Sequence, residues 1–139
     1  MRTNVKDMTE TKVATTREES LKLIELGLDP DTADMYWGYQ REKPTPLPHA
    51  DVEVKAFCVP AWTSSGLLNA LPIIDEEIRP IIERCWNGKY ACKYMHFDEI
   101  KGIATMHIRR FGETPVDAAY AMMKYMLGSY REDSDAKEE

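Results

Sequence analysis

The fourteen residues from Val59 to Pro72 constrain the fold more than any other part of this sequence. Thr63 is a natural N-cap, because its hydroxyl can accept a hydrogen bond from a backbone N–H that the first helical turn leaves unpaired. Trp62 before the cap and Leu67 inside the helix have the spacing of a hydrophobic staple, and the proline ends the helix. A segment this apolar requires burial, so we expect the rest of the domain to pack around this helix.

Two further helix starts occur in the N-terminal third of the chain. Thr16 and Glu19 have the spacing of a capping box, and Gly27 is expected to end the helix that follows. Asp29 precedes a proline and predicts a second, short helical turn. Residues 1–14 are polar and are expected to form a flexible lead-in or an edge strand.

The middle of the chain contains one predicted loop and one ambiguous segment. Gln40 to Ala50 holds prolines at alternate positions, which predicts a loop. Ile78 to Trp86 has apolar residues at helical spacing, and Pro80 suits the first turn of a helix that Gly88 would end. Asn87-Gly88 is also the strongest two-residue hairpin signal. The helix is the preferred prediction, and the hairpin is the alternative.

An antiparallel strand pair is expected next. Lys89 to Phe97 and Ile103 to Phe111 have strand character, and Asp98 to Gly102 supplies the turn. The second strand alternates, with one set of side chains on each face: Ala104, Met106 and Ile108 against Thr105, His107 and Arg109. One face is therefore expected to pack and the other to face water.

The last element is a helix that Thr114 and Pro115 start and that Gly128 is expected to end. Apolar residues cover more than one of its sides, so we expect the sheet to cover one side and a helix or partner chain another. Three of them form the predicted partner-binding surface: Met122, Tyr125 and Met126. Residues 130–139 are expected to form an acidic, disordered tail. Together the elements predict a single α+β domain over residues 15–129, with three to four helices on a small antiparallel sheet.

Charge and composition restrict the compartment and the partners. The net charge is -6, and the nine residues from Arg131 to Glu139 contribute half of it, with five acids and two bases. No apolar run is long enough for a membrane helix, and the N-terminus has no secretory signal. The three cysteines have no framework spacing, which is typical of reduced thiols. We therefore expect a cytoplasmic protein.

Two clusters have superficial ion-binding patterns. Asp29, Asp31 and Asp34 resemble the start of a calcium loop, but its sixth and twelfth positions lack the required glycine and glutamate. Thr63 to Gly66 opens a helix and is a candidate anion site. Helix capping accounts for both clusters without an ion.

Motifs with a known catalytic mechanism are missing from the sequence: it has no P-loop, dinucleotide-binding glycine pattern, nucleophile-elbow serine or zinc-protease histidine pair. The candidate metal ligands are Cys58, Cys85, Cys92 and His96. They lack the closely spaced cysteine pairs of structural zinc sites, so we predict neither a metal nor a cofactor. A small enzyme that uses a Cys92–His96 pair is the one enzymatic hypothesis.

Bases and aromatic residues alternate along Tyr90 to Phe111, which is typical of single-strand nucleic-acid surfaces. The predicted contact residues are Lys93, His107, Arg109 and Arg110. Because the chain has no net excess of base, nucleic-acid binding is the alternative function and not the leading one.

Three segments of the sequence are distinctive when taken together: Leu23 to Met35, Val59 to Pro72, and Thr114 to Tyr120 with the terminal helix. They resemble a family of small uncharacterised proteins encoded by phages, prophages and mobile elements of gut anaerobic bacteria, and the resemblance covers about Thr15 to Leu127. The resemblance implies a setting inside a bacterial cell and supplies no catalytic residues. The leading hypothesis is a non-enzymatic accessory protein that binds a bacterial host or phage protein, with a homodimer as its expected form.

Overall fold

The computed structural model describes residues 12–38, 45–46 and 58–138, with the backbone alone for 45–46 and 129–138. Its elements in chain order are α2 (Arg17–Glu25), the 3-10 helix η1 (Pro30–Thr32), β1 (Met35–Trp37), β2 (Thr45–Pro46), β3 (Val59–Ala61), α4 (Ser64–Ala70), β4 (Ile78–Arg84), β5 (Tyr90–Asp98), β6 (Ile103–Gly112) and α5 (Pro115–Glu138). The predicted α+β class is confirmed, although the strands form two antiparallel sheets, ordered β2-β1-β3 and β4-β5-β6.

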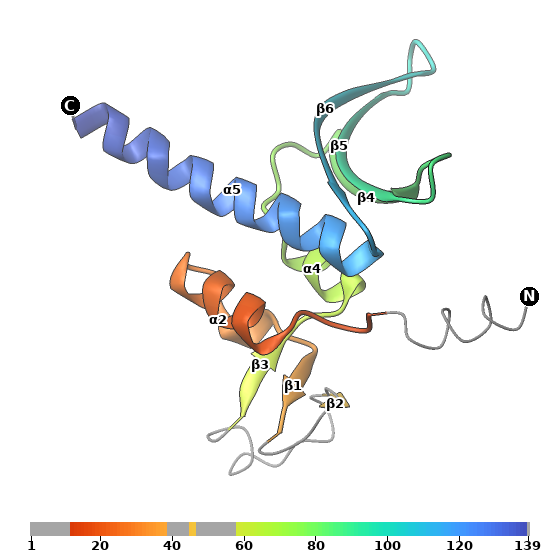
Figure 1. Cartoon of the computed structure of the whole chain (residues 1–139). Coiled ribbons are helices and arrows are strands. Elements are labelled where there is room, and N and C mark those ends of the chain that lie inside the picture. Colours follow the sequence, from red (N-terminus) through yellow and green to blue (C-terminus); the bar gives the residue numbers. More distant parts are fainter. Residues whose placement is uncertain (1–11, 39–44, 47–57, 139) are drawn as a thin grey trace, which may run out of the picture.

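The two sheets lie on opposite sides of α5 (Figure 1). The β4-β5-β6 sheet packs against α5, while α4 and α2 contact α5 from the other side. The β2-β1-β3 sheet lies beyond α2, which packs on β3. The helix that the sequence predicts to be covered on more than one side therefore has the sheet on one side and two helices on another.

Trp62 lies at the centre of the described core, as the sequence predicts. Its side chain is fully buried together with Leu67, which completes the staple. Its backbone N–H donates to the Thr15 hydroxyl at 3.1 Å, and its indole N–H donates to the Thr32 hydroxyl at 3.0 Å. The tryptophan therefore joins α4 to two segments that lie 30 and 47 residues away in the chain.

Both predicted caps of α2 are confirmed. Thr16 and Glu19 form the capping box. At the other end Gly27 adopts a φ of 110°, and the Leu28 N–H donates to the Leu23 carbonyl at 2.9 Å, which is the bond of a Schellman motif. Local sequence is sufficient here because every partner lies within six residues.

The domain begins before the predicted boundary at residue 15. Ala14 is buried, and the Lys12 ammonium contacts carboxylates of Glu19 and Asp117 at 2.6 Å each. Residues 12–14 are therefore part of the packed structure, and the rest of the predicted lead-in, residues 1–11, lies outside the described residues. Most of the predicted loop from Gln40 to Ala50 also lies outside them, and Thr45–Pro46 forms the edge strand β2.

The preferred helix near Asn87-Gly88 is wrong, and the hairpin alternative is correct. Ile78–Arg84 is the strand β4, which pairs antiparallel with β5. Gly88 has a φ of 85°, a conformation that suits a tight turn. The error arises because Ile78 and Ile82, four residues apart, lie on one face of a strand as well as on one face of a helix.

The predicted β5–β6 pair is confirmed, but its alternation is interrupted. Tyr94 lies opposite Ile108, whereas Met95 lies opposite Met106, so His107 is the extra residue of a β-bulge. The bulge places Met106 and Ile108 on opposite faces of the sheet, although simple alternation predicts the same face. Ile108 packs against the core, and Met106 is 45% exposed.

The final helix continues past its predicted end. α5 extends through Glu138, so Gly128 is an interior residue and residues 130–138 belong to the helix and not to a disordered tail. A glycine inside a helix costs only about 1 kcal/mol relative to alanine, which the following helix-forming residues can offset. Within the described ranges, no helix has the length and apolar character needed to cross a membrane.

Candidate partner-binding surface

The structure divides the three residues predicted to bind a partner. Met122 is fully buried in the core of its own chain, so it is not a surface residue and this part of the prediction is wrong. Met126 is half-buried against the same core. Tyr125 is 36% exposed, and the Arg110 guanidinium lies 3.8 Å from its ring centroid. It lines a shallow groove between α2 and α5.

The four predicted nucleic-acid contacts do not share one face. Lys93 and Arg109 lie directly opposite each other on β5 and β6. Arg110 is on the other face, against Tyr125. His107 is in the bulge, with its ring 6.0 Å from that of His96. Of the four residues, the register places only Lys93 and Arg109 on the same side of the sheet.

Those two cations already have partners within the chain. Lys93 donates to a Glu83 carboxylate at 2.8 Å, and the Arg109 guanidinium lies 4.8 Å from the Phe111 ring centroid. These contacts relieve the repulsion between like charges placed opposite each other on neighbouring strands. The strand face is therefore less basic than its sequence suggests.

The Cys92–His96 pair does not form. The two residues share a strand face, as predicted, but four strand positions separate their Cα atoms by about 13 Å. Burial raises the pKa of the Cys92 thiol to about 12, and its side chain is fully buried. The His96 ring instead lies 3.0 Å from a Glu77 carboxylate. A thiol in this setting is a packing group and not an activated nucleophile.

The candidate metal ligands are likewise separate. Cys58 and Cys85 are half-buried, and neither they nor Cys92 form a disulfide. Among the residues with described positions, no group of three or more histidine, cysteine, aspartate or glutamate side chains could hold a metal ion.

The N-terminus of α4, a candidate anion site, holds a carboxylate of the chain itself. Asp34 accepts hydrogen bonds from the Thr63 N–H, at 2.8 Å, and from the Thr63 hydroxyl. A side chain at Gly66 would collide with this carboxylate, so only glycine leaves room for it. Asp29 caps η1 through the Asp31 N–H, as predicted. The sequence could not reveal the role of Asp34, because its partner lies 29 residues away.

The β4-β5-β6 sheet presents a second surface, which includes Lys93 and Arg109 of the predicted nucleic-acid site together with apolar residues that the sequence analysis did not assign to it. Because residues directly opposite on antiparallel strands share a face, the register defines the side of β4-β5-β6 away from α5, here called the outer face. It contains apolar and charged residues: Ile81, Ala91, Met95, Phe97, Ala104, Met106 and Phe111, with Arg79, Glu83, Lys93 and Arg109.

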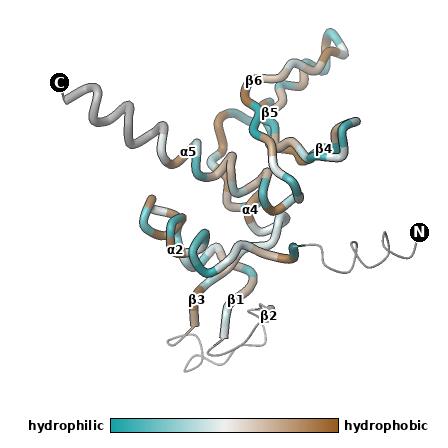
Figure 2. The backbone as a smooth tube through the Cα atoms, in the orientation of Figure 1, coloured by the Kyte–Doolittle hydropathy of each residue, from teal (hydrophilic) through white to brown (hydrophobic). Residues whose placement is uncertain are grey.

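Large apolar side chains on the outer face remain exposed. Phe97 is 39%, Met106 45% and Phe111 48% exposed. Figure 1 shows the sheet curving away from α5, so that the β5–β6 turn stands clear of the helices. Hydrophobic residues continue along these strands beyond the part that α5 covers (Figure 2). The β-bulge adds to the exposed apolar surface of the outer face, because it turns Met106 onto this face.

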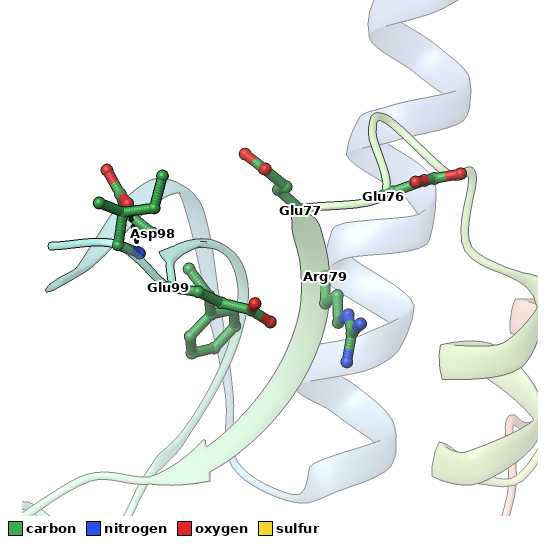
Figure 3. Close-up of a pocket in the computed structure, with 7 residues that line it drawn as sticks. Glu76, Glu77, Arg79, Asp98 and Glu99 are labelled. Atoms are coloured by element: carbon green, nitrogen blue, oxygen red, sulfur yellow. Dashed lines mark hydrogen bonds between the residues drawn. The ribbon is translucent and has the colours of Figure 1, made fainter. Parts of the chain in front are cut away.

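An acidic hollow lies at the far end of the outer face, between the start of β4 and the β5–β6 turn. Its lining residues are Glu76, Glu77, Arg79, Phe97, Asp98, Glu99 and Ile100. Figure 3 shows Glu76 and Glu77 pointing away from each other, with Asp98 and Glu99 across the hollow. The carboxylates do not converge on one point, so the hollow contributes an acidic edge to the surface and not an ion site.

Comparison of the chain with protein-family models, curated proteins and solved structures found no match in any of the three.

Proposed function

We propose that this chain is a non-enzymatic binding protein that uses the outer face of the β4-β5-β6 sheet to contact a protein partner. The exposure of Phe97, Met106 and Phe111 on one face of one sheet carries the proposal. The Lys93–Arg109 pair lies between Phe111 and Met106 on this face. Exposed apolar side chains that gather on one face among polar groups are typical of protein interaction sites. Burying them against a partner is favourable at about 25 cal/mol per Å² of apolar surface removed from water.

The charges on the outer face indicate what the partner presents. Arg79, Lys93 and Arg109 are cationic and Glu83 is the one acid among the outer-face residues. A protein segment with apolar side chains and carboxylates complements these cations, and basic or uncharged groups suit the end of the face that carries the acidic hollow. The phosphate backbone of a nucleic acid complements the outer face less well, because the face has few cations and one of them, Lys93, is paired with Glu83.

The resemblance to phage and mobile-element proteins supplies the setting for this proposal. In this proposal the partner is a protein of a bacterial host, or of the mobile element itself, and binding occurs in the cytoplasm of that host. Binding alone would be the activity, as for an accessory protein that alters a host process without catalysing a reaction.

The experiment is a capture from bacterial lysate with the tagged full-length chain, with one half of each sample treated with nuclease and both read by mass spectrometry. The test variant is Met106→Glu, which places a charge on the outer face. Its matched control is Thr105→Glu, which makes the same change one residue away on the opposite face of the same exposed strand end.

The proposal expects one stoichiometric protein that survives nuclease treatment, binds the wild type and the Thr105→Glu control, and is lost with Met106→Glu. Circular dichroism should show that both variants are folded. Capture that disappears with nuclease would support nucleic-acid binding instead. A partner that binds both variants equally would exclude the outer face as its contact surface.

A further inference from the structure

The two edges of the β4-β5-β6 sheet differ in how well they are protected against pairing with another molecule. Within the described chain, the strand order leaves β4 and β6 as the edge strands. An edge strand directs part of its backbone N–H and C=O groups away from the sheet, where they can pair with a strand of another chain. Proteins commonly block such an edge with proline, with charged side chains or with a covering element.

The β4 edge is blocked by its own sequence. Pro80 lies inside the strand and has no N–H to donate to a neighbouring strand. Arg79, Glu83 and Arg84 add charged side chains along the same seven-residue strand. A second strand added to β4 would therefore lose a hydrogen bond and would have to accommodate these charges.

The first half of β6 has neither kind of protection. Residues 103–107, with the sequence Ile-Ala-Thr-Met-His, contain no proline, lysine, arginine or acid. All five are exposed, which shows that no other segment of the chain covers them. The β5–β6 turn, from which this part of β6 starts, stands clear of the helices (Figure 1). This run therefore offers an unprotected strand edge.

The same five residues complement a second copy of themselves. When two β6 strands run antiparallel about a two-fold axis at Thr105, Ala104 of each copy lies opposite Met106 of the other, and the two Thr105 residues lie opposite each other. Apolar side chains then meet on the outer face, and hydroxyl groups meet on the other face. Arg109 lies beyond the five paired residues, so the pairing places no like charges opposite each other.

We propose that two copies of this chain dimerise by antiparallel pairing of residues 103–107 of β6 about a two-fold axis at Thr105. The two three-stranded sheets then form one continuous sheet of six strands. Both outer faces lie side by side on one side of this sheet, so the dimer goes beyond the partner binding proposed above and does not depend on it. Five residue pairs bury less surface than a standard interface, so we expect a weak dimer with a Kd in the micromolar range.

The test uses position 105, where the two-fold axis brings each side chain next to its own copy. Sedimentation equilibrium of the full-length wild type, from about 1 to 500 μM, should show dimerisation. Thr105→Glu alone and Thr105→Lys alone should each raise the dimer Kd at least about fivefold, because each variant places like charges opposite each other. An equimolar mixture of the two variants should form a heterodimer about as stable as the wild-type dimer.

The matched controls are Trp86→Glu and Trp86→Lys. They introduce the same charges at a residue that is 98% exposed, in the β4–β5 turn at the opposite end of the sheet, and both should dimerise like the wild type. Circular dichroism should show that all variants are folded. Amide hydrogen exchange of the wild type is a second measurement that needs no variant. Exchange at residues 103–107 should slow as the protein concentration rises, while exchange in β4 should not change.

Four results would each overturn the proposal: a monomeric wild type, Thr105 variants that dimerise like the wild type, a mixture of the folded variants that stays monomeric, or β6 exchange that does not depend on concentration. The failure of this dimer is distinguishable from the failure of partner binding. The Thr105→Glu monomer retains its outer face, so it should still capture the partner in the lysate experiment, where only Met106→Glu loses it.

Discussion

The two faces of the β4-β5-β6 sheet are built from the same three strands, yet one is completed by the chain and the other is not. Against α5, the Cys92 and Tyr94 side chains are fully buried, and the Tyr94 hydroxyl donates to the Pro72 carbonyl at 2.7 Å. On the outer face, Met106 and Phe111 remain about half exposed. The comparison shows that side-chain type does not decide burial here; the element packed against each face does.

Truncating one large side chain on each face tests most directly whether the two faces differ in their contribution to stability. Tyr94→Ala should lower the free energy of unfolding by about 3–5 kcal/mol, because it opens a cavity in the core. Met106→Ala, next to it across the bulge, should change stability by less than about 0.5 kcal/mol. Urea denaturation of both variants measures the difference.

The comparison would fail if the two truncations had similar costs, because the outer face would then be as well packed as the inner one. Tyr94→Phe refines the result. It retains the ring and removes the hydrogen bond to Pro72, so it should cost about 1 kcal/mol.

The second prediction concerns thiol reactivity. Because burial raises the pKa of Cys92 from 9.0 to about 12, its thiolate fraction near pH 8 should be about a thousandfold below that of a thiol at the ordinary value. Iodoacetamide labelling of the folded chain, followed by peptide mass spectrometry, should therefore modify Cys92 far more slowly than a model thiol. Labelling at a comparable rate would show that the inner face opens readily.

The third prediction tests an ion pair that ties α2 to the start of α5. Burial lowers the pKa of the Lys12 ammonium, but its hydrogen bonds to Asp117 and Glu19 outweigh this effect and raise the pKa above 10.5. The ion pairs of Lys12 should stabilise the fold fully below its unfolded pKa of 10.5. This stabilisation should be lost as the pH rises through the higher pKa of the folded state.

Lys12→Met should therefore lower stability by about 1 kcal/mol at pH 8, and wild type and variant should converge as the pH rises above 10.5 through the folded value. Urea midpoints at several pH values measure this. A difference that does not depend on pH would mean that the methylene stem of Lys12, and not its charge, stabilises the structure.

The smallest effect is expected on the outer face. Glu83→Gln removes the carboxylate that contacts Lys93 and leaves Lys93 opposite Arg109. Because Glu83 is about half exposed, the loss should be only about 0.5 kcal/mol and should decrease further in high salt. A loss as large as that of Tyr94→Ala would contradict the description of this face as weakly coupled to the core.

Local sequence was sufficient where the interacting groups are close in the chain. The Thr16–Glu19 capping box, the stop at Gly27 and the Thr63 cap could all be predicted, because each depends on a few neighbouring residues. The β4 hairpin was the alternative prediction and not the preferred one, for a different reason. Isoleucines four residues apart satisfy both helical and strand periodicity, so the pattern alone could not distinguish them.

The candidate surfaces were harder to predict because they depend on tertiary structure. Met122 and Tyr125 have similar hydrophobic character in the sequence, but only the packing of α5 decides that the first is buried and the second exposed. The outer face includes Met106 because of the bulge at His107, and no residue type in the sequence predicts that bulge. The acidic segment after Gly128 was recognised by its charge, but its continuation as helix was not.

The contacts of Trp62 have a consequence for the order in which the chain folds. β4, β5, β6 and α5 follow one another as neighbours in sequence and in space, so they can assemble through short loops. The bond from Trp62 to Thr15 must instead close 47 residues of chain, which costs more conformational entropy before any contact is gained. We therefore expect the C-terminal half to form first and the N-terminal segment to dock onto it afterwards.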